Sequence, residues 1–126
     1  MNKPRTFTIL TVDHGPVTLT CPEWCTSEHA PNGHRVDITH VGDVRRLTLP
    51  VRGAYAELLT VSLEARPFTE AWPGTAPFVS VGFNDGHHPS SVYRLEVMAG
   101  QLERHAEELR DAARRLAVIL AEGEGR

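Results

Sequence analysis

Cysteine and histidine residues gather in one short stretch of this 126-residue chain. The stretch holds both cysteines and four of the seven histidines: Cys21, Cys25, His14, His29, His34 and His40. Its centre, residues 21–29, reads CPEWCTSEH, a C-x3-C-x3-H pattern. Thiolate sulfur and imidazole nitrogen are the ligands that zinc prefers, and a closed structural site holds four of them at tetrahedral corners. The pattern therefore predicts a zinc site near the N-terminus.

The fourth ligand must come from the chain that follows. We predict that Pro22 begins a helical turn, which places Cys21, Cys25 and His29 on one side. A strand over residues 34–41 would point both His34 and His40 to its apolar face, so periodicity does not choose between them. We expect His40 to be the ligand and His34 its substitute, because ten residues between His29 and His40 leave room to reverse direction. Two thiolates and two neutral imidazoles would make the zinc site neutral.

The same residues carry a family resemblance. The chain reads Cys21-Pro22-x-Trp24-Cys25-Thr26, then His29, a later histidine, a strand-rich middle and a C-terminal segment rich in Ala, Leu and Arg. In this it resembles an uncharacterised family of small actinobacterial proteins with a CPxWCT...H...H signature. The resemblance implies that Cys21, Cys25, His29 and His40 act as one set, and it implies no activity.

Two other chemistries fit these residues. A reversible disulfide between Cys21 and Cys25 is the main rival, since residues four apart on a turn can reach bridging distance. An open zinc site would keep three protein ligands and a water, and would make the protein a zinc-dependent hydrolase with His87 or Asp85 assisting. Residues 84–86, Asn-Asp-Gly, are typical of a turn, so we expect the histidines that follow them to be solvated.

Short segments with alternating apolar residues predict the strands that position the site. Residues 6–12 and 17–20 should form a hairpin, and residues 44–51 should return antiparallel to the strand at 34–41. Apolar and polar residues also alternate over residues 55–65, 78–83 and 91–97, which predicts three further strands. Three prolines and one glycine indicate a loop over 66–77. Only the stretch 99–121 shows a long helical period.

These elements predict an α+β fold: an antiparallel sheet of about five to seven short strands, one long C-terminal helix packed on it, and a small zinc-binding turn near the N-terminus. We expect residues 1–126 to form a single domain. Within it the zinc module would span about 14–43, the sheet about 44–97 and the helix about 99–121.

Composition limits the classes of function and partner. Thirteen basic and sixteen acidic residues give a net charge of −3, which argues against a protein devoted to neutralising phosphates. Nucleic acid is a possible but less favoured partner. The arginines that could contact it are Arg45, Arg46, Arg110, Arg114 and Arg115, but acidic residues interleave with the last three. Apolar residues beside the main stripe of the helix suggest an unknown protein partner or a homodimer through that helix: Ala112, Val118 and Ile119.

No stretch has the apolar length of a secretory signal or a membrane span. We therefore expect a cytoplasmic protein, in a compartment where cysteines stay reduced or bind metal. No motif of a known enzyme class occurs, so a non-enzymatic role as an interaction, regulatory or accessory protein is favoured.

Overall fold

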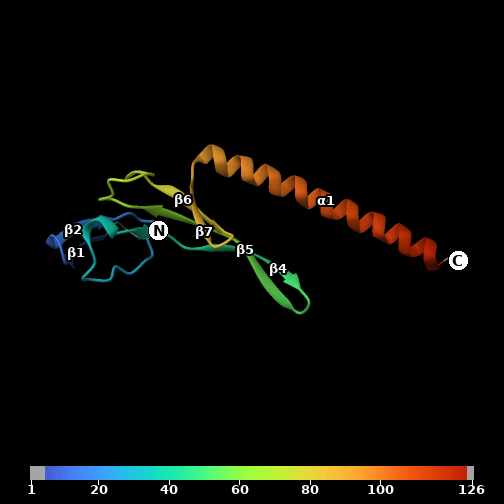
Figure 1. Ribbon diagram of the computed structural model, residues 1–126, viewed down its shortest axis with the longest axis horizontal. Coiled ribbons are helices and arrows are strands. Elements are labelled where there is room, and N and C mark those ends of the chain that lie inside the picture. Colours follow the sequence, from blue (N-terminus) through green and yellow to red (C-terminus); the bar gives the residue numbers. More distant parts are fainter. Residues whose placement is uncertain (1–4, 125–126) are drawn as a thin grey trace. The chain divides into compact units, whose positions relative to one another are not determined.

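The computed structural model describes residues 5–124 and has the expected α+β composition (Figure 1). It contains seven strands, a short 3-10 helix and one long α-helix. In chain order these are β1 (Arg5–Thr11), β2 (Gly15–Cys21), η1 (Arg35–Asp37), β3 (His40–Val41), β4 (Arg45–Val51), β5 (Ala54–Ala65), β6 (Phe78–Phe83), β7 (Gly86–Ser90) and α1 (Val92–Glu124).

The chain divides into two compact units, one ending at Ser90 and the other beginning at Ser91. The first contains all seven strands, and the second contains α1. A single domain over 1–126 and a helix packed on the sheet stay predictions. Within residues 5–124, no helix combines the length and apolarity needed to cross a bilayer.

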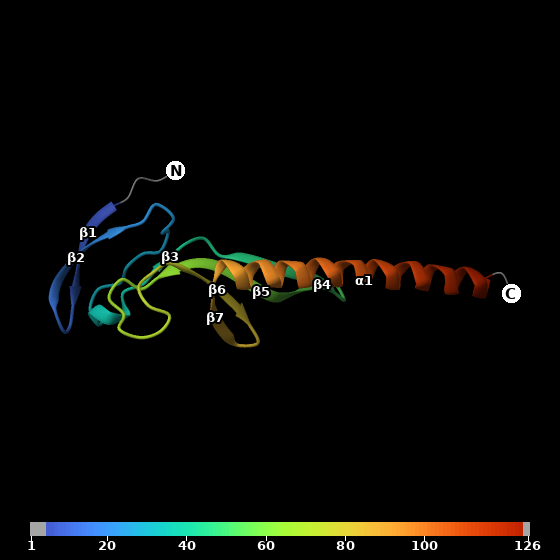
Figure 2. The ribbon, with the colours of Figure 1, turned by 90° about the horizontal axis from the view of Figure 1, so that it is seen from above.

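Strands β1 and β2 form an antiparallel hairpin that is a sheet of its own (Figure 2). Threonine hydroxyls pair across its exposed face, at Thr6 with Thr20 and at Thr8 with Thr18. Its other face contributes Ile9 and Leu19 to a small core completed by Ile38, which follows η1. Half-buried side chains surround this core: Phe7, Val17 and Phe68. The predicted hairpin is therefore confirmed.

The second sheet is built around β5. Strand β6 pairs with one edge of β5, and β7 continues outward from β6. Strands β4 and β3 follow one another along the other edge of β5, where β4 pairs with residues 54–61 and β3 with residues 64–65. Alternation fills the centre of this sheet with apolar side chains, and Val81 of β6 is fully buried.

Four element predictions were wrong. Residues 34–41 do not form one strand: a 3-10 turn occupies 35–37, and within this range only His40–Val41 forms a strand. This short strand pairs with β5 and not with the strand at 45–51. Residues 86–90 form β7, an unpredicted strand. Residues 91–97 are helical, so the sheet ends at Ser90 rather than at 97 and the helix spans Val92–Glu124 rather than 99–121.

The start of α1 has a local cause. The side-chain oxygen of Ser91 accepts a hydrogen bond from the backbone N–H of Arg94 at 3.2 Å. This contact satisfies one of the amide groups left without a partner in the first helical turn. Ser91 is therefore the N-cap. Tyr93, Leu95 and Val97 alternate as in a strand, but they lie in the first two turns of α1.

Candidate metal centre

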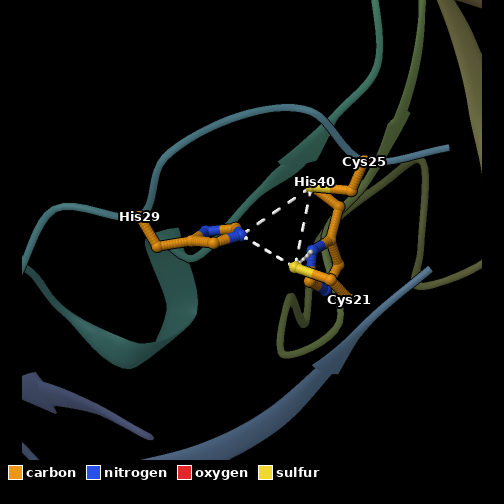
Figure 3. A group of neighbouring side chains, drawn as sticks. All are labelled: Cys21, Cys25, His29 and His40. Atoms are coloured by element: carbon orange, nitrogen blue, oxygen red, sulfur yellow. Dashed lines mark hydrogen bonds between the residues drawn. The ribbon is translucent and has the colours of Figure 1, made fainter. Parts of the chain in front are cut away.

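Four side chains that could bind a metal ion converge in the first unit (Figure 3). The ligand atoms of Cys21, Cys25, His29 and His40 all lie within 4.8 Å of one another. The two sulfurs are 3.7 Å apart, and Cys21 Sγ lies 3.2 Å from His29 Nε2 and 3.5 Å from His40 Nδ1. Around one zinc ion, ideal bond lengths would separate two sulfurs by about 3.8 Å and sulfur from nitrogen by about 3.6 Å. The four groups are thus close enough to bind one metal ion.

The two cysteines are held by a strand end and a tight turn. Cys21 is the last residue of β2. The backbone N–H of Cys25 donates to the carbonyl of Pro22 at 3.0 Å, which closes a turn and brings the second sulfur back beside the first. The helical turn predicted from Pro22 is therefore wrong, since no helix is found between residues 21 and 29. Both cysteines are free thiols, not a disulfide.

The two histidines come from a loop and from the second sheet. His29 lies in the irregular stretch after Cys25, and His40 is the first residue of β3, opposite Ala65 of β5. The carbonyl of Val41 accepts hydrogen bonds from the N–H groups of Thr26, at 3.0 Å, and Ser27, at 3.2 Å. These bonds fix the segment after Cys25 against β3. The site therefore joins the β1–β2 hairpin to the β5 sheet.

His40 is in this group and His34 is not. His34 is exposed and directly precedes the 3-10 helix η1. Asn32 and Gly33, just before it, are hydrogen-bonded to the β1–β2 hairpin, through Asn32 N–H to Leu10 at 2.8 Å and Val12 N–H to Gly33 at 2.9 Å. These bonds direct the chain past Cys21, Cys25 and His29 before it reaches His40.

Two neighbours of the four residues were not predicted. The ring of Phe7 stacks on His29, with 4.7 Å between ring centroids and 23° between planes. The hydroxyl of Ser27 lies 3.4 Å from Cys25 Sγ. Phe7 occupies the same face of β1 as Ile9, a signal that could have placed it near the site. Groups around metal ligands fix ring orientation and adjust ligand basicity.

Burial favours the ligand form of both imidazoles. Desolvation lowers the pKa of His29 and of His40, and nearby Arg5 lowers the pKa of His29 further. The neutral ring that results is the form that binds metal. For His40, the proximity of His29 acts in the same direction.

The pKa values of the two thiols are shifted in opposite directions. Desolvation, followed by the neighbouring Cys25, raises the pKa of Cys21. Burial also raises the pKa of Cys25, but hydrogen bonds from the Ser27 side chain, the Ser27 backbone and the Val41 backbone outweigh it, so the pKa of Cys25 is lowered. Cys25 is accordingly the more easily ionised thiol of the pair.

The group is enclosed by the protein. Cys21, Cys25 and His40 are 1%, 3% and 4% exposed, and His29 is half-buried. Four protein ligands around one ion leave no coordination position for water or substrate, which is the arrangement of structural rather than catalytic zinc sites.

Asp85 and His87 lie in another part of the first unit. Through the pairing of β7 with β6 and of β6 with β5, His87 lies level with Thr60 of β5. His40 is opposite Ala65 of the same strand. Five residues along β5 correspond to about 16 Å. Asp85 and His87 line a cleft of about 510 Å³ with Glu57 and Thr60, away from the four converging residues. This placement gives no support to their assisting a metal-bound water.

The arginines considered for nucleic-acid binding have acidic neighbours. Arg46 lies 3.3 Å from Glu57 on the β4–β5 ribbon. On α1, Arg110 pairs with Glu107 and Arg114 with Asp111. Such pairs reduce the local positive field around Arg46, Arg110 and Arg114.

Comparison with known proteins identifies one matching family, and neither a curated protein nor a solved structure matches. The model of a family described as a domain of unknown function, DUF6907, matches residues 6–118. The match includes all four converging residues and most of α1.

Proposed function

This chain belongs to the DUF6907 family of domains of unknown function, and we propose that it is a small zinc-binding domain with a structural metal site. Cys21, Cys25, His29 and His40 bind the ion, and the domain acts as an interaction, regulatory or accessory protein. It works in the cytoplasm, where reducing conditions keep both thiols available to the metal.

The observation that carries this proposal is the convergence of two sulfurs and two imidazole nitrogens, which all lie within 4.8 Å of one another. Sulfur and nitrogen separations of 3.2 to 3.8 Å bracket the value of about 3.6 Å expected around zinc. A mixed pair of thiolates and imidazoles favours zinc over calcium or magnesium, which prefer oxygen ligands.

A structural role follows from what the ion would connect. Among residues 5–124, the core beside the hairpin contains three buried apolar side chains, Ile9, Leu19 and Ile38, each contributing about 1.5 to 3 kcal/mol. Small modules with so little buried surface usually need a metal or a disulfide to hold their shape. Zinc binding would supply that stability directly.

Metal analysis tests the proposal. Protein purified without a polyhistidine tag or chelator should contain one zinc ion per chain. X-ray absorption at the zinc edge should show two sulfurs near 2.3 Å and two nitrogens near 2.0 to 2.1 Å. Absence of bound metal, or a shell dominated by oxygen, would contradict the proposal.

Paired variants test which residues bind. His40→Ala should lose the ion and the ordered structure around it, while His34→Ala should retain both, because His34 is exposed and outside the group. Retention of zinc by His40→Ala, with an exchangeable water in its place, would instead indicate an open site.

The two alternatives have their own measurements. A zinc-dependent hydrolase would cleave activated esters in proportion to bound zinc, and Asp85→Asn or His87→Ala would abolish cleavage. A nucleic-acid-binding zinc module would be retained on immobilised DNA in a salt-dependent manner. We expect neither result, because Asp85 and His87 lie away from the four ligands, and Arg110 and Arg114 of α1 are paired with acidic residues.

A further inference from the structure

The helix α1 carries a regular seam of apolar residues. Leu95, Leu102, Leu109 and Leu116 follow one another at seven-residue intervals. A second series, also seven residues apart, lies midway between them: Val92, Ala99, Ala106, Ala113 and Leu120. The two series alternate at steps of three and four residues without a polar interruption. This is the a/d pattern of a coiled coil, with leucine at d and mostly alanine at a.

The period of this seam indicates its partner. A 3.5-residue repeat sustained over four heptads keeps a narrow stripe facing another helix along its whole length. Over residues 91–124, the unit that begins at Ser91 contains one helix of 33 residues and no second element to cover the seam. We propose that the seam binds α1 of a second copy of this chain, as an antiparallel coiled coil.

The antiparallel direction follows from side-chain size. When the helices run in opposite directions, each a residue faces a d residue of the other chain. Centred on the helix, this places Ala106 opposite Leu109 of the other chain and Ala99 opposite Leu116. The central layers then each combine an alanine and a leucine, and Leu95 meets Leu120 of the other chain at each end. A parallel pair would stack Ala on Ala and Leu on Leu, and the helices could not keep a constant separation.

The charges beside the seam favour the same direction. Antiparallel helices bring e positions together, and Glu103 of one chain then faces Arg110 of the other, twice in each dimer. At the g positions Met98 faces Ile119, an apolar pair. In a parallel dimer Glu103 would face Met98, and Arg110 would face His105, so no opposite charges would meet.

Oligomeric state tests the seam. Analytical ultracentrifugation of the full chain should show a dimer, and Leu116→Glu should weaken it at least about 100-fold, because the dimer would bury two unpaired carboxylates. Val118→Glu is the matched control: it adds the same charge two residues away at an f position, outside the seam, and should leave the dimer intact. A monomeric wild-type protein, whose helix covers its own sheet instead, overturns the proposal. Equal dimer strength in the two variants also overturns it.

Charge exchange tests the direction. Glu103→Arg alone places Arg opposite Arg110, and Arg110→Glu alone places Glu opposite Glu103, so each homodimer should be weaker than wild type. Mixing the two variants restores two opposite-charge pairs in an antiparallel heterodimer, which should form in preference to either homodimer. No preference for the mixed dimer overturns the antiparallel arrangement. Metal content does not enter these measurements, so they are independent of the zinc proposal.

Discussion

Single side chains around the four converging residues control how well the site is preorganised. Phe7 stacks on His29, and a stacked aromatic pair contributes about 0.5 to 1.5 kcal/mol beyond its buried area. Ser27 lies against Cys25 and lowers the pKa of that thiol. Neither group can bind the ion in place of a ligand, so their effects should be on affinity and not on stoichiometry.

Phe7→Leu should therefore weaken zinc binding about five-fold, since leucine keeps the apolar contact but loses the ring stacking. Competition with a chromophoric chelator would measure the change. Phe68→Leu is a suitable control, because Phe68 packs on the same small core and should alter stability without altering zinc affinity. Equal affinities for Phe7→Leu and wild type would contradict the role given to the ring.

Acid should destabilise the metal-free protein through the two buried histidines. Burial lowers the pKa of His29 and His40 below 6.5, so as the pH falls the unfolded chain takes up protons that the folded chain does not. The free energy of unfolding should decrease between about pH 7.5 and about pH 5.5. Urea denaturation in the presence of chelator would measure it. His40→Asn should reduce this slope and His34→Ala should preserve it; a slope of opposite sign would refute the argument.

Residue types predicted the four converging side chains better than local geometry did. His40, and not His34, lies beside Cys21, Cys25 and His29, although the strand assumed for residues 34–41 and the helical turn assumed from Pro22 are both absent. Sequence spacing shows how far the chain can reach. It does not show that bonds from Asn32 and Gly33 to the hairpin carry the backbone past His34. Those bonds link segments distant in sequence, and no local pattern encodes them.

At the scale of elements, a glycine holds the metal-binding turn close to the sheet. A Cβ atom at Gly42 would lie 2.9 Å from the backbone oxygen of Trp24, in the turn that carries Cys25, and 3.6 Å from Leu63 of β5. The backbone N–H of Gly42 also donates to Leu63 at 2.9 Å. Because one contact is with backbone, a larger residue must displace the turn or the strand.

Gly42→Ala should cost about 1 to 3 kcal/mol of stability and weaken zinc binding, because the displaced turn carries a ligand. Gly33→Ala makes the same substitution where a Cβ would meet nothing within 4 Å, and its effect should stay within about 0.5 kcal/mol. Urea unfolding of the zinc-loaded proteins would compare them. Similar losses for both variants would show that the close approach to Trp24 is unimportant.

The sequence predicted most strands and failed where residue types conflict with tertiary pairing. β6 was predicted at its observed bounds because Val79, Val81 and Phe83 alternate. β7 was not, since its sequence Gly-His-His-Pro-Ser has no residue with strand preference, and only pairing with β6 makes it extended. The helix start was missed although Ser91 is a typical N-cap.

At the scale of the whole molecule, buried apolar side chains are unevenly distributed in the first unit. The hairpin side has the core of Ile9, Leu19 and Ile38, and the β5 sheet is centred on Val81. The four converging residues lie between these regions, with Cys21 on the hairpin and His40 on the sheet. Loss of an ion at this position should therefore affect the two regions unequally.

Removal of zinc by a chelator should increase amide hydrogen exchange most in residues 5–41. The hairpin is a sheet of only two strands that the ion would join to the rest of the unit, whereas β5 and β6 each have neighbouring strands on both edges. Exchange measured by mass spectrometry with and without zinc would locate the change. Equal loss of protection in peptides from both regions would contradict this distribution of stability.

The pairing of His40 with Ala65 has a consequence for the order of events during synthesis. Both thiols and both imidazoles emerge from the ribosome before the strand end that positions His40 emerges. A nascent chain of 40 residues would hold every ligand but not the backbone partner that aligns the last of them. The complete centre can therefore form only after residue 65 has emerged, and metal capture would coincide with closure of the second sheet rather than precede it.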